Sequence, residues 1–248
     1  MRFLLLLACA AALSAASKPH VVFVTGDDEY KSEETMPAIA KVLEAKHGMR
    51  CTVLYARPTA QTKNNIEGLE ALGSADLMVM YVRFRELPEH QLRHILDYTE
   101  SGKPMVGLRT STHAFRYPAG SPRAELNDGF GRRVWGQRWI RHHGSASSTD
   151  VTIAPGLQKR PILRGVEKSF HARSWLYEVL PLEGDAQPLL IGRAVNPQGK
   201  DAGPQPVAWT RTYKGARVFF TTLGHPEDFE TPSMRTLLLN GIRWALGK

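Results

Sequence analysis

The N-terminal half of the chain alternates short apolar runs with segments of helical periodicity. The run from His20 to Gly26 is almost continuously apolar, which is typical of a strand buried on both faces of a sheet. Similar runs cover 51–55, 76–82 and 104–108, and the segment 88–101 has the spacing of an amphipathic helix. Strands that alternate with helices pair in parallel through right-handed crossovers. We therefore expect a doubly wound, mostly parallel α/β sheet of the flavodoxin-like kind.

The pattern changes after Arg109. Residues 110–148 are rich in Gly, Arg, His, Trp and Ser without periodicity, which indicates a long functional loop region with short helices. The rest of the chain predicts strands at 151–154, 175–180, 188–193, 207–213 and 216–222, with a turn at Lys214 and Gly215 between the last two. A closing helix begins at Thr231 and Pro232. We therefore expect an antiparallel C-terminal strand pair added to the parallel sheet.

The first residues have the pattern of an export signal. Arg2 supplies the charge, an apolar stretch follows, and residues 14–16 are the small residues of a cleavage site. We expect residues 1–17 to be a signal peptide, residues 18–248 to form one domain, and the mature protein to be periplasmic or secreted without a membrane segment. Cys9 leaves a lipid-anchored form as an alternative. Cys51 is then the single cysteine, so core burial rather than a disulfide stabilises the domain.

The chain is basic, with 32 Lys and Arg against 24 Asp and Glu and a formal charge of +8. The basic residues are scattered and form no run interleaved with aromatic residues, so we expect no nucleic-acid partner. A small-molecule partner fits this diffuse charge better. The composition leaves a homo-oligomer open.

Polar side chains follow the predicted parallel strands at the point where each strand ends. Ligands of open parallel sheets bind beyond the carboxyl ends of the strands, so these segments should meet at one edge. They are 26–30 (GDDEY), 83–85 (RFR), 109–113 (RTSTH) and 224–227 (GHPE). We expect substrate contacts from Asp27, Asp28, Tyr30, Arg83, Ser111 and His113.

Four segments, VVFVTGDDEY, LMVMYVRF, GKPMVGLRTSTHAF and PVAWTRTYKGARVFFTTLGH, resemble the ThuA-like (trehalose utilisation) family, which has the class I glutamine amidotransferase-like fold. The resemblance spans about residues 18–247, and its last segment is the most specific. It implies a single ThuA-like domain that serves the utilisation of carbohydrate, either trehalose or a keto-sugar. The wider superfamily has a nucleophilic Cys after the fourth strand and a His-x-Glu pair near the C-terminus. His225 and Glu227 match the pair, whereas Arg109 occupies the position of the nucleophile.

An arginine cannot attack a carbonyl because its guanidinium stays protonated, so we do not expect glutamine hydrolysis. His225 can serve as a general base or acid oriented by Glu227 or Asp228, or it can merely cap its loop. Arg109 can stabilise an anion or a developing enolate, or it can form a salt bridge with Asp27 or Asp28.

The long loop region adds histidines and aromatic rings. His142 and His143 follow the segment 135–139, as a histidine does in members of the family, and we expect both to contact substrate together with Trp139. His113, His142, His143 and His171 leave a divalent metal site open, but no spacing such as H-x-x-x-H occurs, so we expect no cofactor. The rings of Trp135, Trp139, Phe115, Tyr30, Phe84 and Trp175 offer faces on which sugars stack, with Glu178 among the hydroxyl partners.

These features together favour an exported enzyme that performs acid–base chemistry on a sugar, as an isomerase or a lyase. His225 would be the base, and Arg109 or a loop histidine would stabilise the oxyanion. A non-catalytic sugar-binding module, a metal-dependent hydrolase and a serine-dependent hydrolase using Ser111 are the alternatives.

Overall fold

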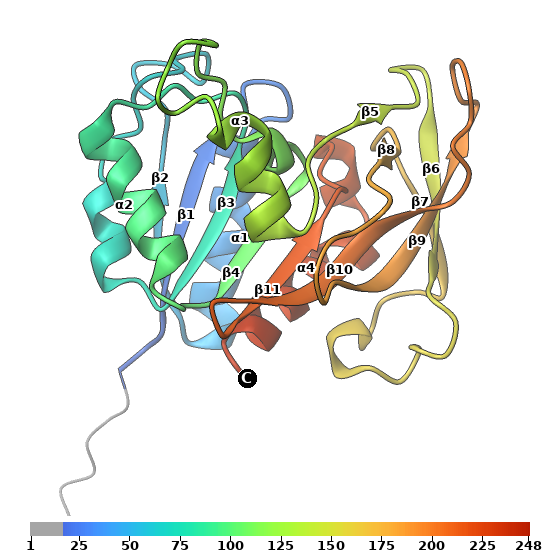
Figure 1. Cartoon of the computed structure of the whole chain (residues 1–248). Helices are drawn as coiled ribbons and strands as arrows, with labels where there is room; N and C mark the ends of the chain where they lie inside the picture. The colour runs from blue at the N-terminus through green and yellow to red at the C-terminus, as the bar shows by residue number, and fades with distance from the viewer. Residues whose placement is uncertain (1–16) are drawn as a thin grey trace, which may run out of the picture.

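The computed structural model describes residues 17–248, so nearly all of the expected signal peptide lies outside the described residues. The chain forms a nine-stranded mixed sheet in the order β2-β1-β3-β4-β11-β10-β9-β6-β7, and a separate two-stranded sheet of β5 and β8 (Figure 1). Helices lie against both faces of the larger sheet. The predicted α/β class is confirmed.

Five adjacent strands are parallel. They are β1 (His20–Gly26), β2 (Arg50–Leu54), β3 (Leu77–Val82), β4 (Met105–Leu108) and β11 (Ala216–Thr221). Every residue of β1, β3 and β4 is buried, which is why their sequences are apolar on both faces. The carboxyl ends of these strands therefore point toward one edge of the sheet.

The other half of the sheet is antiparallel. It consists of β10 (Gln205–Tyr213), β9 (Gln187–Val195), β6 (Ser148–Ile153) and β7 (Ser169–Ala172). The expected pair β10 and β11 is present, but β11 is an inner strand parallel to β4 and three further antiparallel strands continue the sheet. A mostly parallel sheet is therefore found in the N-terminal half alone.

The predicted strand 175–180 is shorter than expected. Only β8 (Tyr177–Glu178) pairs, with β5 (Arg141–His142). The side-chain oxygen of Gln205 accepts hydrogen bonds from the backbone N–H groups of Val179 and Leu180, at 2.9 and 3.2 Å, so these groups do not extend the strand.

Helices cover the two faces because successive residues of the buried strands point to opposite sides. Phe23 joins the core beneath α1 (Ser32–His47) and α4 (Pro232–Ala245). Val22 joins the core that includes residues of α2 (Glu89–Glu100), α3 (Leu126–Phe130) and the 3-10 helix η1 (Leu69–Ser74). Figure 1 shows α2 and α3 in front of the sheet and α1 and α4 behind it. The sheet is doubly wound, as predicted.

One local prediction is also confirmed. The hydroxyl of Thr231 accepts a hydrogen bond from the backbone N–H of Met234 and caps α4, with Pro232 in the first turn. Cys51 pairs with Val21 near the amino end of β2, far from the carboxyl edge, and burial raises the pKa of its thiol to about 12. Within residues 17–248, no helix is both long and apolar enough to cross a bilayer.

Candidate functional site

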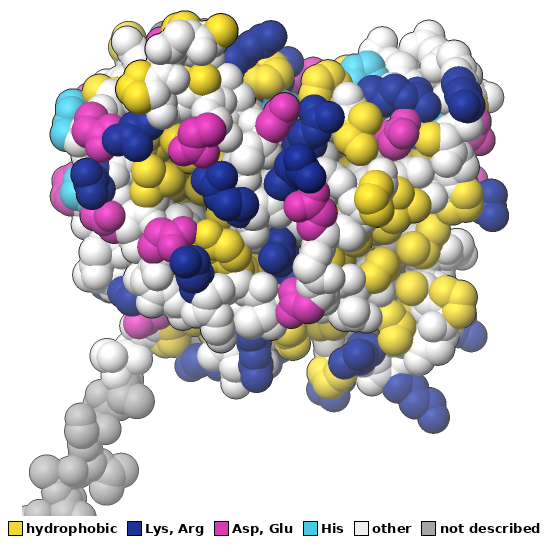
Figure 2. Space-filling view, in the orientation of Figure 1, with side chains coloured by type: hydrophobic (Ala, Val, Ile, Leu, Met, Phe, Trp, Pro, Cys, Tyr) yellow, Lys and Arg dark blue, Asp and Glu magenta, His cyan; other side chains and the backbone are white. Residues whose placement is uncertain are grey.

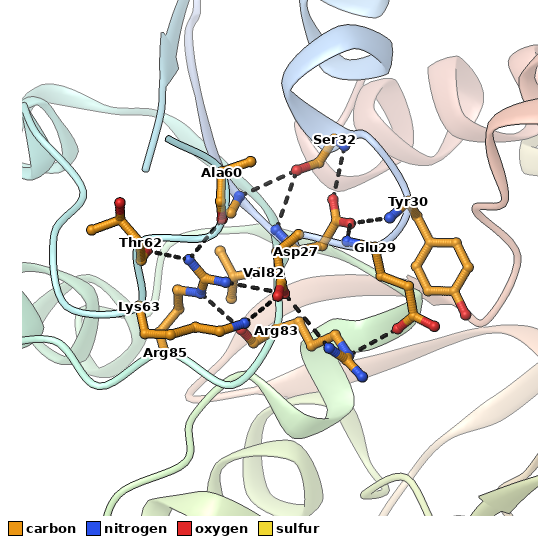
Figure 3. Close-up of polar contacts among 12 residues, drawn as sticks. Asp27, Glu29, Tyr30, Ser32, Ala60, Thr62, Lys63, Val82, Arg83 and Arg85 are labelled. Atoms are coloured by element: carbon orange, nitrogen blue, oxygen red, sulfur yellow. Dashed lines mark hydrogen bonds and ion pairs between the residues drawn. The ribbon is translucent and has the colours of Figure 1, made fainter. Parts of the chain in front are cut away.

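The loop after β1 is shaped by Asp27. Its buried carboxylate accepts hydrogen bonds from the backbone N–H groups of Glu29 and Ser32, both at 2.8 Å, and of Tyr30 (Figure 3). Asp27 therefore uses its acceptor capacity to fold the loop. The loop in turn places Glu29 and Tyr30 at the carboxyl edge of the sheet.

Asp28 belongs to a cluster of ion pairs beside this loop. Its carboxylate lies 3.2 Å from the buried guanidinium of Arg85 and 3.6 Å from Arg83, and it also pairs with Lys63. Arg83 extends to Glu29 at 2.9 Å (Figure 3). The structure therefore brings Asp28 and Arg83 together, but it pairs them with each other and with neighbouring charges.

Arg109 stands where β4 turns into the 3-10 helix η2 (Arg109–His113), in the left-handed region with φ 38°. Its side chain is fully buried. Nη1 donates to the carbonyl of Thr222 at 2.8 Å, and Nη2 donates to the hydroxyl of Tyr30 at 3.1 Å. The alternative salt bridge to Asp27 or Asp28 is absent, because those carboxylates bind backbone N–H groups and other cations.

Aromatic rings surround the Arg109 guanidinium. Its central carbon lies 4.3 Å from the ring centroid of Tyr30, 4.5 Å from that of Tyr177 and 5.8 Å from that of Trp175. Burial raises the pKa of Tyr30 and of Tyr177, so both hydroxyls are neutral at pH 7. Burial alone disfavours the charge of Arg109, but the surrounding tyrosines raise its pKa, and it remains a cation. Its Nε has no hydrogen-bond partner in the described chain.

Seven rings from distant parts of the sequence form a continuous series at this edge, which we call the ring arc. Successive ring centroids are separated by 6.1, 6.1, 5.0, 6.1, 5.2 and 4.9 Å. In order, the members are His225, Tyr30, Trp175, His142, Trp139, His113 and Phe84. All seven were named from the sequence. His225 was assigned to the catalytic pair, and the other six were assigned to substrate contact or stacking.

His225 caps the 3-10 helix η5 (Pro226–Glu230). Its Nδ1 accepts a hydrogen bond from the backbone N–H of Glu227 at 3.3 Å, so the neutral ring carries its proton on Nε2. The Glu227 carboxylate is exposed and lies 3.9 Å from the same nitrogen. Burial lowers the pKa of His225, although Asp228 and Glu227 partly oppose this effect. His225 is therefore neutral at pH 7 and can donate from Nε2.

Asp228 does not orient the His225 ring. Its buried carboxylate accepts hydrogen bonds from the backbone N–H of Gly224 at 2.9 Å and of Ser174 at 3.1 Å, and from the hydroxyl of Ser174. It also accepts from the backbone N–H of His225 at 3.1 Å. Asp228 thus joins the loop after β11 to the segment that carries Trp175.

The other two histidines of the ring arc also have assigned protons. His142 Nδ1 accepts from the backbone N–H of Gly144 at 3.0 Å, which leaves the proton on Nε2. The Thr112 hydroxyl donates to a backbone carbonyl at 3.1 Å, so it accepts from His113 Nδ1 at 3.1 Å and leaves His113 Nε2 unprotonated. Burial lowers the pKa of His142, and it lowers that of His113 to about 3 with the help of Arg83. The arc therefore offers two imidazole donors and one acceptor.

Two residues expected at the site, Ser111 and His143, and the further loop histidine His171 lie in other settings. The buried Ser111 hydroxyl donates to the carbonyl of Met80 at 2.8 Å and accepts from a backbone N–H, so it is a structural group. His143 is buried, with Nδ1 donating to Leu176 and Nε2 accepting from the backbone N–H of Ala202. His171 lies on the edge strand β7, 2.8 Å from the Asp150 carboxylate. Within residues 17–248, no three His, Cys, Asp or Glu side chains are grouped to hold a metal ion.

A cavity of about 570 Å³ lies at the opposite end of the parallel strands. It is lined by residues that include His20, Arg50 and Asp76, and the Asp76 carboxylate accepts from the backbone N–H of His20 at 2.8 Å. Parallel sheets bind ligands at the carboxyl ends, so we place the candidate site at the ring arc instead.

Sequence reasoning gave no role to Tyr177 and no separate role to Glu29. Tyr177 lies within the predicted strand 175–180, and nothing in the neighbouring sequence indicates that its ring stacks on Arg109. Glu29 is adjacent to the predicted Asp27 and Asp28, so its position after β1 was the available signal. The expected sugar-stacking residues Trp135 and Phe115 are fully buried in the core beneath α3.

Comparisons with known proteins agree with this fold. A family model described as ThuA, trehalose utilisation, matches residues 20–245. Two crystal structures of proteins described as ThuA-like are similar, each with a TM-score of 0.65. The protein from Bacteroides uniformis is 16% identical, and the match covers 96% of this chain and 95% of that chain. The protein from Parabacteroides merdae is 15% identical, and the match covers 93% of this chain and 91% of that chain.

A β-galactosidase from Bacillus circulans is also similar, with a TM-score of 0.55 and 12% identity, over 94% of this chain and 31% of that chain. At these identities the structures establish the fold alone. The comparison with curated proteins returned no match. The family model covers nearly all of the described chain, including every residue of the ring arc. The chain therefore belongs to the ThuA (trehalose utilisation) family.

Proposed function

We propose that this is an exported protein of carbohydrate utilisation that binds a sugar on the ring arc and performs acid–base chemistry there. The observation that carries the proposal is the continuous arc of seven rings at the edge where parallel sheets bind ligands, two of which, Tyr30 and Trp175, lie against the buried Arg109 cation. Aromatic faces bind the apolar faces of sugar rings, and the imidazole nitrogens supply polar groups of both kinds. The signal-like residues 1–17 support export.

In the proposed reaction, a proton is removed beside the carbonyl of a keto-sugar, leading to isomerisation or elimination. Negative charge then develops on the carbonyl oxygen. His225 and His142 each carry a proton on Nε2 and can donate hydrogen bonds to this oxygen, while the buried Arg109 charge stabilises it from beneath the rings. This arrangement favours His225 as a proton donor rather than the base expected from sequence.

The proton acceptor in this scheme is Glu29. Its carboxylate is partly exposed, lies 2.9 Å from Arg83, and belongs to the same loop as the arc residue Tyr30. His113 also presents an unprotonated nitrogen, but a pKa of about 3 makes it a weak base and suits it to accepting a hydrogen bond from a sugar hydroxyl.

The test is a proton NMR time course of the purified mature protein with a 3-keto disaccharide in deuterated buffer. The proposal expects exchange of the proton beside the carbonyl, or product formation, at a rate that falls at least tenfold in Glu29→Gln and in His225→Asn. The exposed Glu230→Gln serves as the matched control and should keep the wild-type rate. Turnover at the wild-type rate in both site variants would refute the assigned roles.

A binding module without chemistry is the second candidate. The observation that favours it is the cap of η5. The His225 ring accepts a hydrogen bond from the backbone N–H of Glu227, so it stabilises this loop whether or not it takes part in catalysis. In that case, wild-type protein and both variants would show chemical-shift changes on binding the sugar, and the sugar itself would remain unchanged.

A further inference from the structure

The charges around the ring arc are unbalanced. Of the acidic side chains beside it, Asp28 is paired with three cations, Glu29 with Arg83, and Glu178 with Arg141 at 2.7 Å. The carboxylates of Asp27 and Asp228 accept hydrogen bonds from uncharged donors, and that of Glu227 is exposed. Arg109 is fully buried without an ion pair in the described chain. Its charge lowers the pKa of His113, His142 and His225, which places it close to three members of the arc.

Two further cations flank the arc without a carboxylate partner among residues 17–248. The guanidinium carbon of Arg116 lies 4.7 Å from the ring centroid of Phe84 at one end. Arg173 donates to the backbone carbonyls of Ser147 and Ser145 at 2.9 and 3.2 Å, and its charge lowers the pKa of His225 at the other end. Cations without a carboxylate partner therefore lie at both ends of the arc as well as at Arg109, although Asp228 and Glu227 offset part of this charge at the His225 end.

Hydrogen-bond donors are also in surplus. His142 and His225 present Nε2–H groups. Of the five buried side-chain N–H groups that have no partner in the described chain, three belong to the arc or to Arg109: Arg109 Nε, Trp139 Nε1 and Trp175 Nε1. A buried donor without a partner costs about 1–3 kcal/mol, so native proteins keep few of them. Three such donors around one site indicate that an acceptor-rich group from outside the chain satisfies them.

We infer that the ring arc takes a sugar bearing an anionic oxygen group, a carboxylate or a phosphate, rather than a neutral sugar. The inference rests on the proposed function for the location of the site and for the sugar. The apolar faces of the arc hold the sugar ring, and the anionic oxygens face the unpartnered N–H groups of Arg109, Trp139 and Trp175. The Nε2–H groups of His142 and His225 remain for the carbonyl oxygen. An anion there neutralises the one buried cation that lacks a counter-charge and accepts the hydrogen bonds that the unpartnered N–H groups need.

The test is isothermal titration calorimetry of the mature protein at low ionic strength with three ligands: methyl β-glucoside, methyl β-glucuronide and glucose 6-phosphate. We expect at least one of the two anionic ligands to bind tenfold or more tightly than the glucoside, and the tighter of the two identifies carboxylate or phosphate as the source of the charge. Equal or weaker binding of both anionic ligands would overturn the inference.

Two variants separate the charge from the fold. Arg116→Gln changes an exposed side chain and should weaken anion binding about threefold while glucoside binding stays unchanged; Arg132→Gln, in the exposed pair with Glu183, is the control. Trp175→Phe keeps an aromatic face but removes an unpartnered N–H, and it should weaken the anionic ligand more than the glucoside. Variants that weaken all three ligands by the same factor would contradict a role for charge.

The outcomes distinguish the two proposals. Glucoside binding at the arc without preference for the anionic ligands refutes the anionic substrate and leaves the proposed function intact. Absence of any sugar binding refutes the proposed function, and the anionic substrate with it.

Discussion

Arg109 and Tyr30 are joined in two ways: the guanidinium carbon lies 4.3 Å from the Tyr30 ring centroid, and Nη2 donates to the Tyr30 hydroxyl at 3.1 Å. The contact joins the end of β4 to the loop after β1. Arg109 also donates to the carbonyl of Thr222, beyond the end of β11. Arg109 thus holds three strand ends together and carries a buried charge close to the ring arc.

Replacing this arginine with lysine should destabilise the protein although the charge is kept. Lysine lacks the planar, forked donors that reach Thr222 and Tyr30 together, so Arg109→Lys should cost about 2–4 kcal/mol in the free energy of unfolding. Urea denaturation monitored by circular dichroism measures the loss. The control is Arg132→Lys, in an exposed pair with Glu183, which should cost less than about 1 kcal/mol. Equal losses in both variants would show that the buried contacts contribute nothing.

His225 has a capping role and a proposed catalytic role, and two substitutions separate them. Asparagine is a good cap and keeps a side-chain acceptor for the Glu227 N–H, whereas alanine removes it. We expect His225→Asn to stay within about 0.5 kcal/mol of wild-type stability and His225→Ala to lose about 1 kcal/mol. Both should lose turnover of the keto-sugar. Turnover retained in the asparagine variant would assign His225 to structure alone.

Asp228 and Glu227 are neighbours, but only substitution of Asp228 is expected to destabilise the protein. Asp228→Asn halves the acceptor capacity of a buried carboxylate that binds Gly224, His225 and Ser174, and it should cost about 2–3 kcal/mol. Glu227→Gln changes an exposed side chain and should leave the midpoint of thermal unfolding within error. Calorimetric melting of the two variants checks the difference. A larger shift in the glutamine variant would contradict the role given to Asp228.

His113 should make the protein less stable in acid. Its pKa is about 3 in the folded state, because burial and then Arg83, Arg109 and Arg116 disfavour its charge, and about 6.5 in the unfolded chain. Between these values the unfolded state binds the extra proton, so stability falls as the pH falls, by at most about 1.4 kcal/mol per pH unit. Urea denaturation at pH 7, 6, 5 and 4 measures the slope. His113→Asn should reduce it, whereas His171→Asn, on the exposed edge strand, should not.

The parallel half of the fold follows from local pattern. The runs at β1, β3 and β4 are apolar at every position, and only a strand buried on both faces requires this. The strand β7 has no such signal, because exposed and buried residues mix in four positions, Ser169 to Ala172, and pairing with β6 decides its conformation. A contact between distant residues also decides the length of β8, because the Gln205 side chain accepts hydrogen bonds from the backbone N–H groups that would otherwise extend the strand.

The sequence by itself determined the alternation of strands and helices and the polar segments at the carboxyl edge, because these depend on residue type and order. Tertiary structure decided which polar groups remain free for a ligand. Asp27 and Ser111 face backbone partners within a few residues or on a neighbouring strand. Trp175 and His142, far apart in sequence, lie ring against ring, and Trp175 also lies beside Arg109. Hydrogen bonds and burial act between atoms that are close in space, and the packing of distant segments alone brings those atoms together.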